Sequence, residues 1–411
     1  MNVLFVHQNF PGQYLHLARH LGANPDNQVV FITQRQDGQL PGVRKIVYQP
    51  AREITPHLHH YLRETEASVL NAQAVLRIAI DLKESGFVPD VILAHNGWGE
   101  LWFLKDIYPQ APLIGYFEFF YRAEGADVGF NPDDPVTPDT CPRLRAKNIG
   151  NLLALDAVDA GQCPTRWQKS LYPERYHDLL HVIHEGVDTN IAIPNADAFI
   201  RFSETGQTLT KDDEVITYLS RNLEPYRGFP EMMRSLPRIM AEQPNAKVVI
   251  VGGDETSYGP GLADGRTFRQ ALQAELGNRV DWQRIYFSGK VPYSTFINLL
   301  QISSVHIYLT YPFVLSWSML EAMSAGCIVV GSRTAPVEEV IIDGQNGFLV
   351  DFFDCDALAD KVIDVLAHQA DYEVIRQRAR QTIIDRYDLH SICLPAHLTL
   401  LNWVQIKQKA K

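Results

Sequence analysis

The sequence contains few cysteines, and their spacing argues against two kinds of stabilisation. Five occur in 411 residues, an odd number, and none stands in a Cys-x-x-Cys pair. Neither a disulfide framework nor a structural zinc site is therefore indicated, and a reducing compartment is expected. The five are Cys141, Cys163, Cys327, Cys355 and Cys393.

Long apolar runs are also missing. No stretch reaches the roughly 18 consecutive apolar residues that indicate a membrane-spanning helix. The first residues, MNVLFVHQNFPGQY, lack the basic start and the small-residue cleavage site of a secretion signal, and they indicate a buried strand and a loop. We expect a cytoplasmic protein, with any membrane contact peripheral at the inner face.

Positive charge is not in excess. Lysine and arginine number 37 against 48 acidic residues, so the net charge is −11. Because nucleic-acid binding needs a basic surface, no nucleic-acid partner is expected. The composition, 46% hydrophobic and 21% charged, is ordinary for a globular protein, and the length suits two domains of about 200 residues each.

Short apolar runs alternate with helical stretches along the whole chain. This alternation predicts an α/β fold with parallel sheets covered by helices on both faces. Residues 54–85 are the longest helical candidate, and the polar residues 187–213 are expected to connect the domains. The predicted strands are residues 3–6, 29–33, 91–94, 113–116, 215–219, 247–251, 285–288, 305–309 and 328–330.

The loops after the predicted strands are the candidate binding sites, because open parallel sheets bind ligands outside the carboxyl ends of their strands. In the first loop only Gly12 offers a bare backbone amide, and there is no G-x-G-x-x-G pattern for a nicotinamide cofactor. His95 follows another strand beside two glycines and a tryptophan, and can point into a cleft or be a satisfied core histidine. Glu118 opens an irregular stretch, residues 117–142, that is either an acceptor site or a packed lid.

The segment at residues 311–332, YPFVLSWSMLEAMSAGCIVVGS, is the most informative. Ser316 is a plausible N-cap, Gly326 a plausible helix stop, and a short buried strand follows. The N-terminus of such a helix favours an anion such as a diphosphate. Glu321 places a carboxylate on the same helix.

This segment resembles the donor-site motif of the retaining glycosyltransferases of family four, the group 1 glycosyl transferases. These have the GT-B fold, two Rossmann-like domains with parallel sheets that face each other across a cleft. Residues 220–228 resemble the family's phosphate-binding loop, in which two basic residues, here Arg221 and Arg227, embrace the donor diphosphate. Further matches in the family's order are residues 184–188, 251–254, 288–292 and 343–350.

The resemblance implies a role for each matched residue. Arg221 and Arg227 would stabilise the departing diphosphate, Glu321 would hold the ribose, and His95 and Glu118 would act at the transferred sugar and the acceptor. The other donor-binding residues that it implies are Gly12, Gly253, Asp254, Lys290, Val291, Phe313, Leu315 and Ser316.

One matched position departs from the family. Phe313 stands where the family usually carries a glutamate that contacts donor-sugar hydroxyls, and phenylalanine cannot accept a hydrogen bond. We therefore expect the sugar to be recognised by backbone amides and by other side chains such as Asp254. Phe313 would pack against the sugar or lie in the core beneath the loop.

The function expected from the resemblance is transfer of a sugar, with retention, from a nucleotide-sugar to a hydroxyl of a glycan, a lipid-linked or a small-molecule acceptor. No metal or other cofactor is expected, and the Asp354-x-Asp356 pair is interpreted as an acidic helix start. A sugar-nucleotide epimerase or hydrolase and a non-catalytic nucleotide-sugar-binding subunit are the alternatives. The expected domains are residues 1–195 and 196–385, with a C-terminal helix over residues 386–411 that packs back on the first domain.

Overall fold

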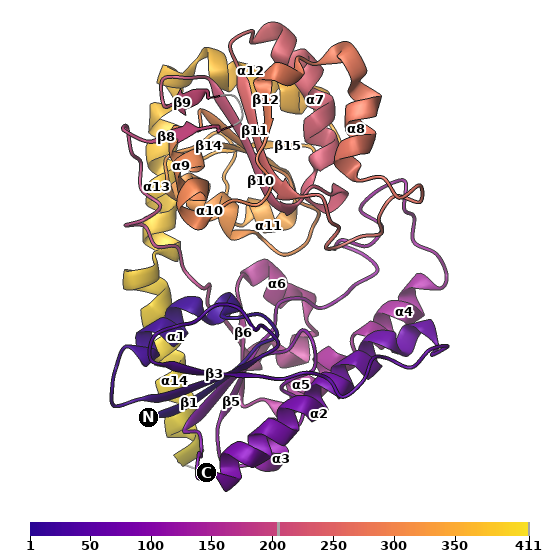
Figure 1. Cartoon of the computed structure of the whole chain (residues 1–411), viewed down its shortest axis with the longest axis vertical. Helices are drawn as coiled ribbons and strands as arrows, with labels where there is room; N and C mark the ends of the chain where they lie inside the picture. Colours follow the sequence, from indigo (N-terminus) through magenta and orange to yellow (C-terminus); the bar gives the residue numbers. More distant parts are fainter. Residues whose placement is uncertain (204–205, 410–411) are drawn as a thin grey trace. The chain divides into compact units, whose positions relative to one another are not determined.

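The alternating apolar runs form parallel strands, as the sequence predicts, in a computed structural model that describes residues 1–203 and 206–409. The chain separates into two compact units (Figure 1). Unit 1 combines Met1–Gly186 with Leu389–Lys411, and unit 2 is Val187–Asp388. The boundaries expected from the sequence were 195/196 and 385/386.

Unit 1 is built on a seven-stranded sheet in the order β3-β2-β1-β4-β5-β6-β7, and all neighbouring strands are parallel. The first strand of the chain therefore lies inside the sheet, where it pairs with both β2 and β4. The strands are β1 (Asn2–Val6), β2 (Gln28–Thr33), β3 (Val43–Val47), β4 (Val91–His95), β5 (Leu113–Tyr116), β6 (Ala160–Cys163) and β7 (Leu180–Val182).

Helices cover both faces of this sheet because its strands carry apolar side chains on both sides. Val3 and Phe5 belong to one buried cluster, together with side chains of α1 and α14, whereas Leu4 and Val6 belong to the cluster on the other face. The C-terminal helix is thus part of the core of unit 1. The helices are α1 (Leu15–Gly22), α2 (Arg63–Glu84), α3 (Leu104–Ile107), α4 (Thr140–Lys147), α5 (Ile149–Ala157), α6 (Arg166–Leu171) and α14 (Leu394–Lys409).

Unit 2 repeats the plan with a six-stranded parallel sheet in the order β12-β11-β10-β13-β14-β15. Its strands are β10 (Val215–Asn222), β11 (Lys247–Gly253), β12 (Ile285–Phe287), β13 (Val305–Tyr308), β14 (Ile328–Ser332) and β15 (Phe348–Val350). Its helices are α7 (Phe229–Glu242), α8 (Phe268–Leu276), α9 (Tyr293–Ile302), α10 (Trp317–Ser324), α11 (Ala335–Glu338), α12 (Cys355–Ala367) and α13 (Glu373–Tyr387).

Residues 187–213 differ from the irregular connection that the sequence suggests. They belong to unit 2 and contain a small antiparallel pair, β8 (Phe199–Arg201) and β9 (Thr208–Thr210). Ile200 and Leu209 face each other in this pair and are buried in the core of unit 2. Each strand has only three residues, so the strand pattern is too short to recognise in the sequence.

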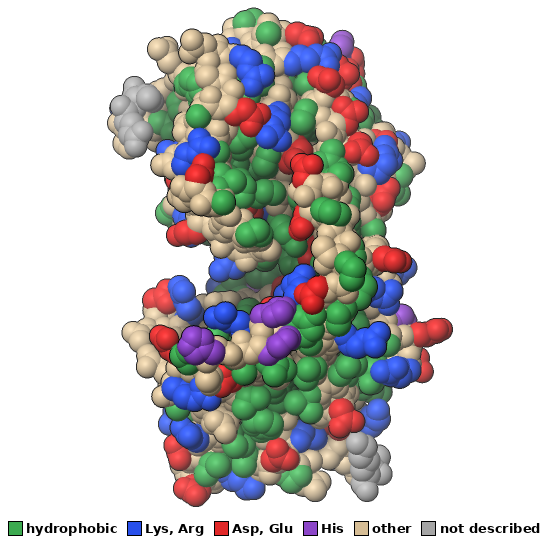
Figure 2. Space-filling view, turned by 90° about the vertical axis from the view of Figure 1, so that its right-hand side faces the viewer, with side chains coloured by type: hydrophobic (Ala, Val, Ile, Leu, Met, Phe, Trp, Pro, Cys, Tyr) green, Lys and Arg blue, Asp and Glu red, His purple; other side chains and the backbone are tan. Residues whose placement is uncertain are grey.

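The structure agrees with two features of the composition, the lack of long apolar runs and the lack of excess positive charge. Within the described residues, no helix is both long and apolar enough to cross a membrane. On the face drawn in Figure 2, acidic and basic side chains are interspersed rather than gathered by sign.

Gly42, just before β3, lies against the end of α1 and gives a test of this packing. A Cβ atom at Gly42 would stand 1.9 Å from the carbonyl oxygen of Gly22, whereas one at Gly86 would meet nothing within 4 Å; both glycines have positive φ, +73° and +91°. Gly86→Ala should therefore cost about 1 to 2 kcal/mol of stability for its backbone conformation alone. Gly42→Ala should cost roughly 1 to 3 kcal/mol more, because the backbone must move.

Denaturant unfolding of the two variants measures this difference. Equal losses of stability would show that the contact between α1 and the turn before β3 is not close.

Candidate functional site

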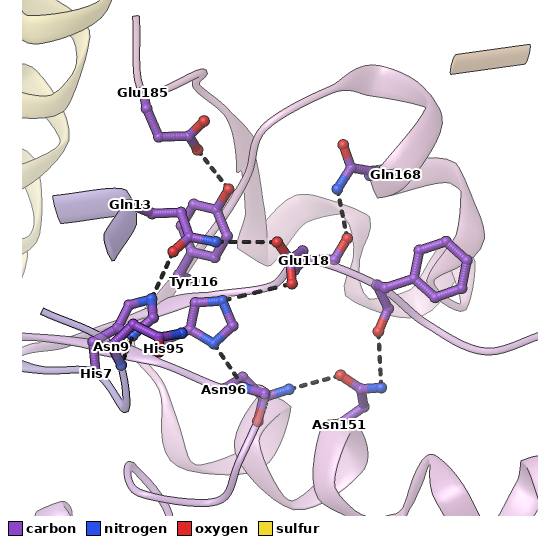
Figure 3. A network of polar contacts seen from close by, with 12 residues as sticks. His7, Asn9, Gln13, His95, Asn96, Tyr116, Glu118, Asn151, Gln168 and Glu185 are labelled. Atoms are coloured by element: carbon purple, nitrogen blue, oxygen red, sulfur yellow. Dashed lines mark hydrogen bonds and ion pairs between the residues drawn. The ribbon is translucent and has the colours of Figure 1, made fainter. Parts of the chain in front are cut away.

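The expected site residues of unit 1 come together at one edge of its sheet. Gly12 lies in the loop after β1, His95 ends β4 and Glu118 follows β5. These strands are adjacent and parallel, so their carboxyl ends meet at the same edge. Figure 3 shows His95 and Glu118 at this edge, linked by polar contacts to residues that the sequence did not single out.

Glu118 is held from two sides and still reaches solvent. Its Oε1 accepts a hydrogen bond from Nε2 of Gln13 at 3.0 Å, and its backbone oxygen accepts one from Nε2 of Gln168 at 2.6 Å. The side chain is 31% exposed. A ligand hydroxyl can therefore reach a carboxylate whose position is already set.

His95 presents a buried N–H group beside this carboxylate. Its Nδ1 accepts the backbone N–H of Gly97 at 2.9 Å, so the ring proton is on Nε2. Nε2 lies 3.9 Å from Oε2 of Glu118, too far for a hydrogen bond, and it has no hydrogen-bond partner among the described residues. The ring stacks between Trp98 and Tyr116.

Burial keeps this histidine neutral. It lowers the pKa of His95 well below the usual value, and the neighbouring His7 lowers it further. The group is therefore a neutral donor at physiological pH, in position for an oxygen atom that the protein itself does not supply.

His7, at the end of β1, repeats the arrangement. Its Nδ1 accepts the N–H of Asn9 at 2.9 Å, so Nε2 carries the proton and donates to Oε1 of Gln13 at 2.6 Å. Burial lowers the pKa of His7 to about 4, although the bond to Gln13 acts in the opposite direction. Gln13 therefore connects His7 to Glu118.

Gly12 stands directly against His7. A Cβ atom at Gly12 would come within 2.6 Å of Nε2 of His7, and its φ is +54°. A glycine is required here by the imidazole ring and by the backbone conformation. Its approach to a donor diphosphate stays a prediction.

Sequence reasoning missed several members of this network, among them His7, Gln13, Tyr116, Gln168 and Glu185. The hydroxyl of Tyr116 donates to Oε1 of Glu185 at 2.5 Å, and both residues are buried. Gln13 follows the glycine that was singled out, and Glu185 lies inside the matched segment at residues 184–188. Their partners, however, come from distant strands, which no local pattern reveals.

In unit 2 the expected donor-binding residues also gather at one edge. Arg221 lies near the end of β10 and Gly253 ends β11, whereas Lys290 and Val291 follow β12. The loop after β13 carries Phe313, Leu315 and Ser316. Strands β12, β11, β10 and β13 are neighbours in this order, so these loops lie side by side.

One of the two exposed cations of this edge, Lys290, is paired with a carboxylate. Nζ of Lys290 lies 2.5 Å from Oε2 of Glu255. The Lys290 ammonium, and at longer range Arg221, hold the pKa of Glu255 below its usual value. A Cβ atom at Gly253 would come within 2.6 Å of both Glu255 and Lys290, so a larger residue would require the side chains of this pair to shift. The sequence did not identify Glu255.

Arg227 is placed differently from Arg221. It is only 8% exposed, and its Nη1 donates to Oγ1 of Thr310 at 2.8 Å and to the carbonyl of Val314 at 2.9 Å. Its guanidinium also lies over the ring of Tyr258. Arg227 thus anchors the loop that follows β13, whereas Arg221 is exposed.

Phe313 lies among aromatic rings. It is 8% exposed and meets Tyr226 and Tyr258 edge-on, with ring centroids 5.4 and 5.0 Å away. Glu224 holds Tyr258 in place, since its Oε2 accepts the backbone N–H groups of Ser257 and Tyr258. An apolar wall therefore occupies the position where the family usually has a carboxylate.

The helix that carries Glu321 begins as expected. Oγ of Ser316 caps α10 by accepting the N–H of Ser318, while the N–H of Ser316 itself donates to the hydroxyl of Tyr308 at 2.7 Å. Leu315 is buried in the core. The backbone amide of Ser316, expected to meet a phosphate, is therefore already in use.

Glu321 lies on the first turns of α10 and is half-buried. Its Oε1 accepts a hydrogen bond from the hydroxyl of Tyr293 at 2.7 Å. Burial raises the pKa of Glu321 to about 7, and the bond from Tyr293 limits the rise.

Asp354, of the Asp354-x-Asp356 pair, has a structural role. Oδ1 of Asp354 accepts the N–H of Ala357 and caps α12. Among the residues that the structure describes, no group of three or more His, Cys, Asp or Glu side chains is arranged to hold a metal ion.

Comparison with known families covers nearly the whole chain. Residues 25–192 match the profile of the Glycosyl transferase family 4 group, and residues 201–382 match that of the Glycosyl transferases group 1. The chain belongs to the group 1 glycosyl transferases. The family that the sequence motifs suggested is thereby confirmed.

Curated relatives are distant. The chain is 24% identical over 221 residues to the N-acetyl-alpha-D-glucosaminyl L-malate synthase of Bacillus anthracis, covering 51% of this chain and 54% of that protein. It is 29% identical over 268 residues to the GDP-mannose-dependent alpha-(1-6)-phosphatidylinositol monomannoside mannosyltransferase of Mycolicibacterium smegmatis, covering 63% of each. The alignments thus span between about half and two thirds of these relatives.

The fold is shared over nearly the full length with a solved structure. Sucrose-phosphate synthase from Thermosynechococcus elongatus superposes with a TM-score of 0.70 at 17% identity, covering 98% of this chain and 99% of that chain. This likeness concerns the fold, and it confirms the GT-B class with its two Rossmann-like units.

The neutral state of His7 predicts a pH dependence of stability. Its pKa is about 4 in the folded protein against an ordinary 6.5, so the unfolded chain binds the extra proton between these values. Neutral His7 therefore contributes to the free energy of unfolding above pH 6.5. This contribution, roughly 3 kcal/mol in total, is lost as the pH falls towards 4. His7→Gln should therefore lose less stability than the wild type over this range.

Denaturant unfolding at several pH values, followed by tryptophan fluorescence, measures the difference. His20→Gln, on the exposed side of α1, controls for loss of a histidine as such. A wild type and a His7→Gln variant with the same pH slope would contradict the buried neutral state.

Proposed function

We propose that this glycosyl transferase moves a sugar, with retention of configuration, from a nucleotide-diphosphate-sugar held by unit 2 to a hydroxyl of an acceptor held by unit 1. The observation that carries the proposal is the Nε2–H of His95, which is buried and has no hydrogen-bond partner among the described residues, beside the part-exposed carboxylate of Glu118. A neutral donor next to an acceptor of hydrogen bonds suits the oxygens and hydroxyls of a sugar. Family membership supports the same reaction.

The donor diphosphate would be bound by cations of unit 2. Arg221 and Lys290 are exposed at the edge of the sheet, and a diphosphate would replace the carboxylate of Glu255 between them. Arg227 would not contact the diphosphate directly. It would hold the loop after β13 in place, next to the N-terminus of α10. Fixed positive charge of this kind stabilises negative charge as it develops, so we expect no metal and no other cofactor.

The other donor groups would be recognised separately. Glu321 would accept the ribose hydroxyls, and the main chain of Val291 would meet the edge of the base. The sugar would meet Asp254, backbone amides such as that of Gly253, and the apolar wall of Phe313. The name of the GDP-mannose-dependent relative supports a nucleotide-sugar donor.

In the reaction, the bond between the sugar C1 and the diphosphate oxygen breaks and a bond from C1 to the acceptor oxygen forms. We propose that the acceptor's proton passes to the departing phosphate oxygen. His95 would donate its Nε2–H to an oxygen of the transferred sugar, and Glu118 would orient the acceptor hydroxyl. His95 is not suited to act as a base, because its Nδ1 is occupied by Gly97 and its Nε2 carries the proton.

A nucleotide-sugar panel tests the function and the phosphate contact together. The protein should transfer sugar from one of the UDP-, GDP-, ADP- or TDP-sugars to a hydroxyl acceptor, and NMR of the product should show the donor's anomeric configuration. Arg221→Ala should weaken donor binding by about 10- to 150-fold, the range of a charge-assisted hydrogen bond, without lowering the melting temperature. Arg238→Ala, an exposed arginine on α7, is the matched control.

Other outcomes favour other functions. Epimerisation or fast hydrolysis of the donor without acceptor would favour the epimerase or hydrolase alternative. Nucleotide-sugar binding without any turnover would favour a non-catalytic subunit, and an inverted product would exclude retention.

Glu321 predicts a pH dependence of nucleotide binding. Burial raises its pKa to about 7, and ribose hydroxyls that donate to it would favour the ionised form, so affinity should increase as pH rises through 7. In Glu321→Gln the affinity should be lower and flat with pH. Tyr293→Phe removes the hydrogen bond that limits the rise in the pKa of Glu321. In this variant the nucleotide affinity should therefore increase at a higher pH than in the wild type.

Isothermal titration with the preferred nucleotide between pH 6 and pH 8 measures these effects. Equal affinity for the ribose and deoxyribose forms would rule out the ribose contact.

A further inference from the structure

Unit 1 contains a pocket that the proposed chemistry does not use. It has a volume of about 570 Å³, within the usual range for small-molecule sites. It lies between the segment after β3 and the first half of α2. Its lining residues are Gln49, Pro50, Arg52, Glu53, Ile54, Ala67, Leu70 and Asn71.

One wall of the pocket, which includes Arg52, is fixed by the carboxylate of Glu66. Glu66, on α2, accepts hydrogen bonds from Nη2 of Arg52 at 2.8 Å and from the backbone N–H and the hydroxyl of Thr55 at 2.7 and 2.6 Å. The bonds from Thr55 and then from Arg52 lower the pKa of Glu66 to about 2, so it stays ionised. The wall is therefore set before any ligand arrives.

The lining combines apolar surface with amides. Pro50, Ile54 and Leu70 offer carbon atoms to the C–H face of a ring, while the exposed Gln49 offers an amide donor and acceptor to hydroxyls. This combination suits a hydroxylated ring better than a purely apolar chain.

The charges of the pocket are unfavourable to an anion. Arg52 is the one cation among the described lining residues, and it is paired with Glu66. Glu53 adds a negative charge, so a phosphate or carboxylate group would enter without a free cation to meet it.

The pocket is connected to the proposed reaction site by direct contacts. Nδ2 of Asn71 donates to the carbonyl of Trp98 at 3.0 Å, and the ring of Trp98 stacks on His95 with centroids 4.7 Å apart. Nε2 of Gln34 donates to Oδ1 of Asn71 at 2.9 Å and fixes the orientation of this amide. A ligand in the pocket would thus lie one residue away from the Trp98 and His95 pair.

We propose that this pocket binds the non-reacting part of the acceptor, and that this part is an uncharged, polyhydroxylated ring such as a sugar or cyclitol. The proposal rests on the proposed function for the identity of the ligand as acceptor. It distinguishes this chain from the Bacillus anthracis relative, whose name includes the anion malate.

Binding of matched ligand pairs to the full chain tests the chemistry of the pocket without relying on turnover. Saturation-transfer NMR would compare myo-inositol with its 3-phosphate and methyl glucoside with glucose 6-phosphate, with L-malate as a further anion. At least one neutral ring should bind about tenfold or more tightly than its phosphorylated partner. Tighter binding of the phosphates or of malate, or no binding of any neutral ring at millimolar concentration, would overturn the proposal.

A change of charge should reverse the preference. Gln49→Lys adds a cation to the pocket and offsets the charge of Glu53, so the ratio of phosphate to neutral affinity should rise by about tenfold. Gln73→Lys is the matched control, because Gln73 is exposed on α2 and does not line the pocket. An equal change in the two variants would mean that the ligands bind elsewhere.

A second variant tests the fixed wall. Glu66→Ala releases Arg52 and Thr55, so the neutral ring should bind several-fold more weakly while nucleotide affinity stays the same. Unchanged affinity for the ring would contradict the role of the wall.

These measurements separate the pocket from the proposed reaction. If neutral rings bind and Gln49→Lys reverses the preference, but no sugar is transferred from any donor, the pocket stands and the proposed function fails. If sugar is transferred and the ratio of affinities does not respond to Gln49→Lys, the pocket assignment alone fails.

Discussion

Parallel strand pairing is the constraint on which both groups of site residues depend. Each apolar run must be covered on both faces by helices. Because neighbouring strands are parallel, the loops that follow them open at the same edge of the sheet. β1, β4 and β5 bring Gln13, His95 and Glu118 together in this way, although 105 positions separate Gln13 from Glu118. In unit 2 the same rule collects Arg221 and Lys290 beside Glu255.

The histidines at the strand ends of unit 1 share a second feature. His7, His95 and His184 each accept, at Nδ1, the backbone N–H of the residue two positions further along. The local backbone therefore selects one tautomer for all three rings and leaves the proton on Nε2. For His7 and His95, burial also keeps the ring neutral, so these two rings are oriented donors without positive charge. Such groups suit sugar oxygens better than phosphates.

Unit 2 combines the opposite properties. Its exposed cations suit a diphosphate, while the position of the family's missing glutamate is filled by the packed rings of Phe313, Tyr226 and Tyr258. The two arginines that the sequence treated alike have become different: Arg221 is exposed, and Arg227 is buried and bonded to the loop after β13. Burial, and not residue type, distinguishes Arg221, the proposed phosphate contact, from Arg227, which holds the loop.

The sequence by itself determined the fold class, the family and most of the strand ends, because apolar periodicity and motif order are local properties of the chain. It also singled out His95, Glu118 and Glu321 as candidates by their places after strands or on the helix behind the motif. Only the tertiary structure decided the tautomer of His95, the role of Gln13 between His7 and Glu118, the pairing of Lys290 with Glu255, and the pocket behind Asn71. Each of these depends on distances and on exclusion of water between segments far apart in the chain, which residue spacing does not encode.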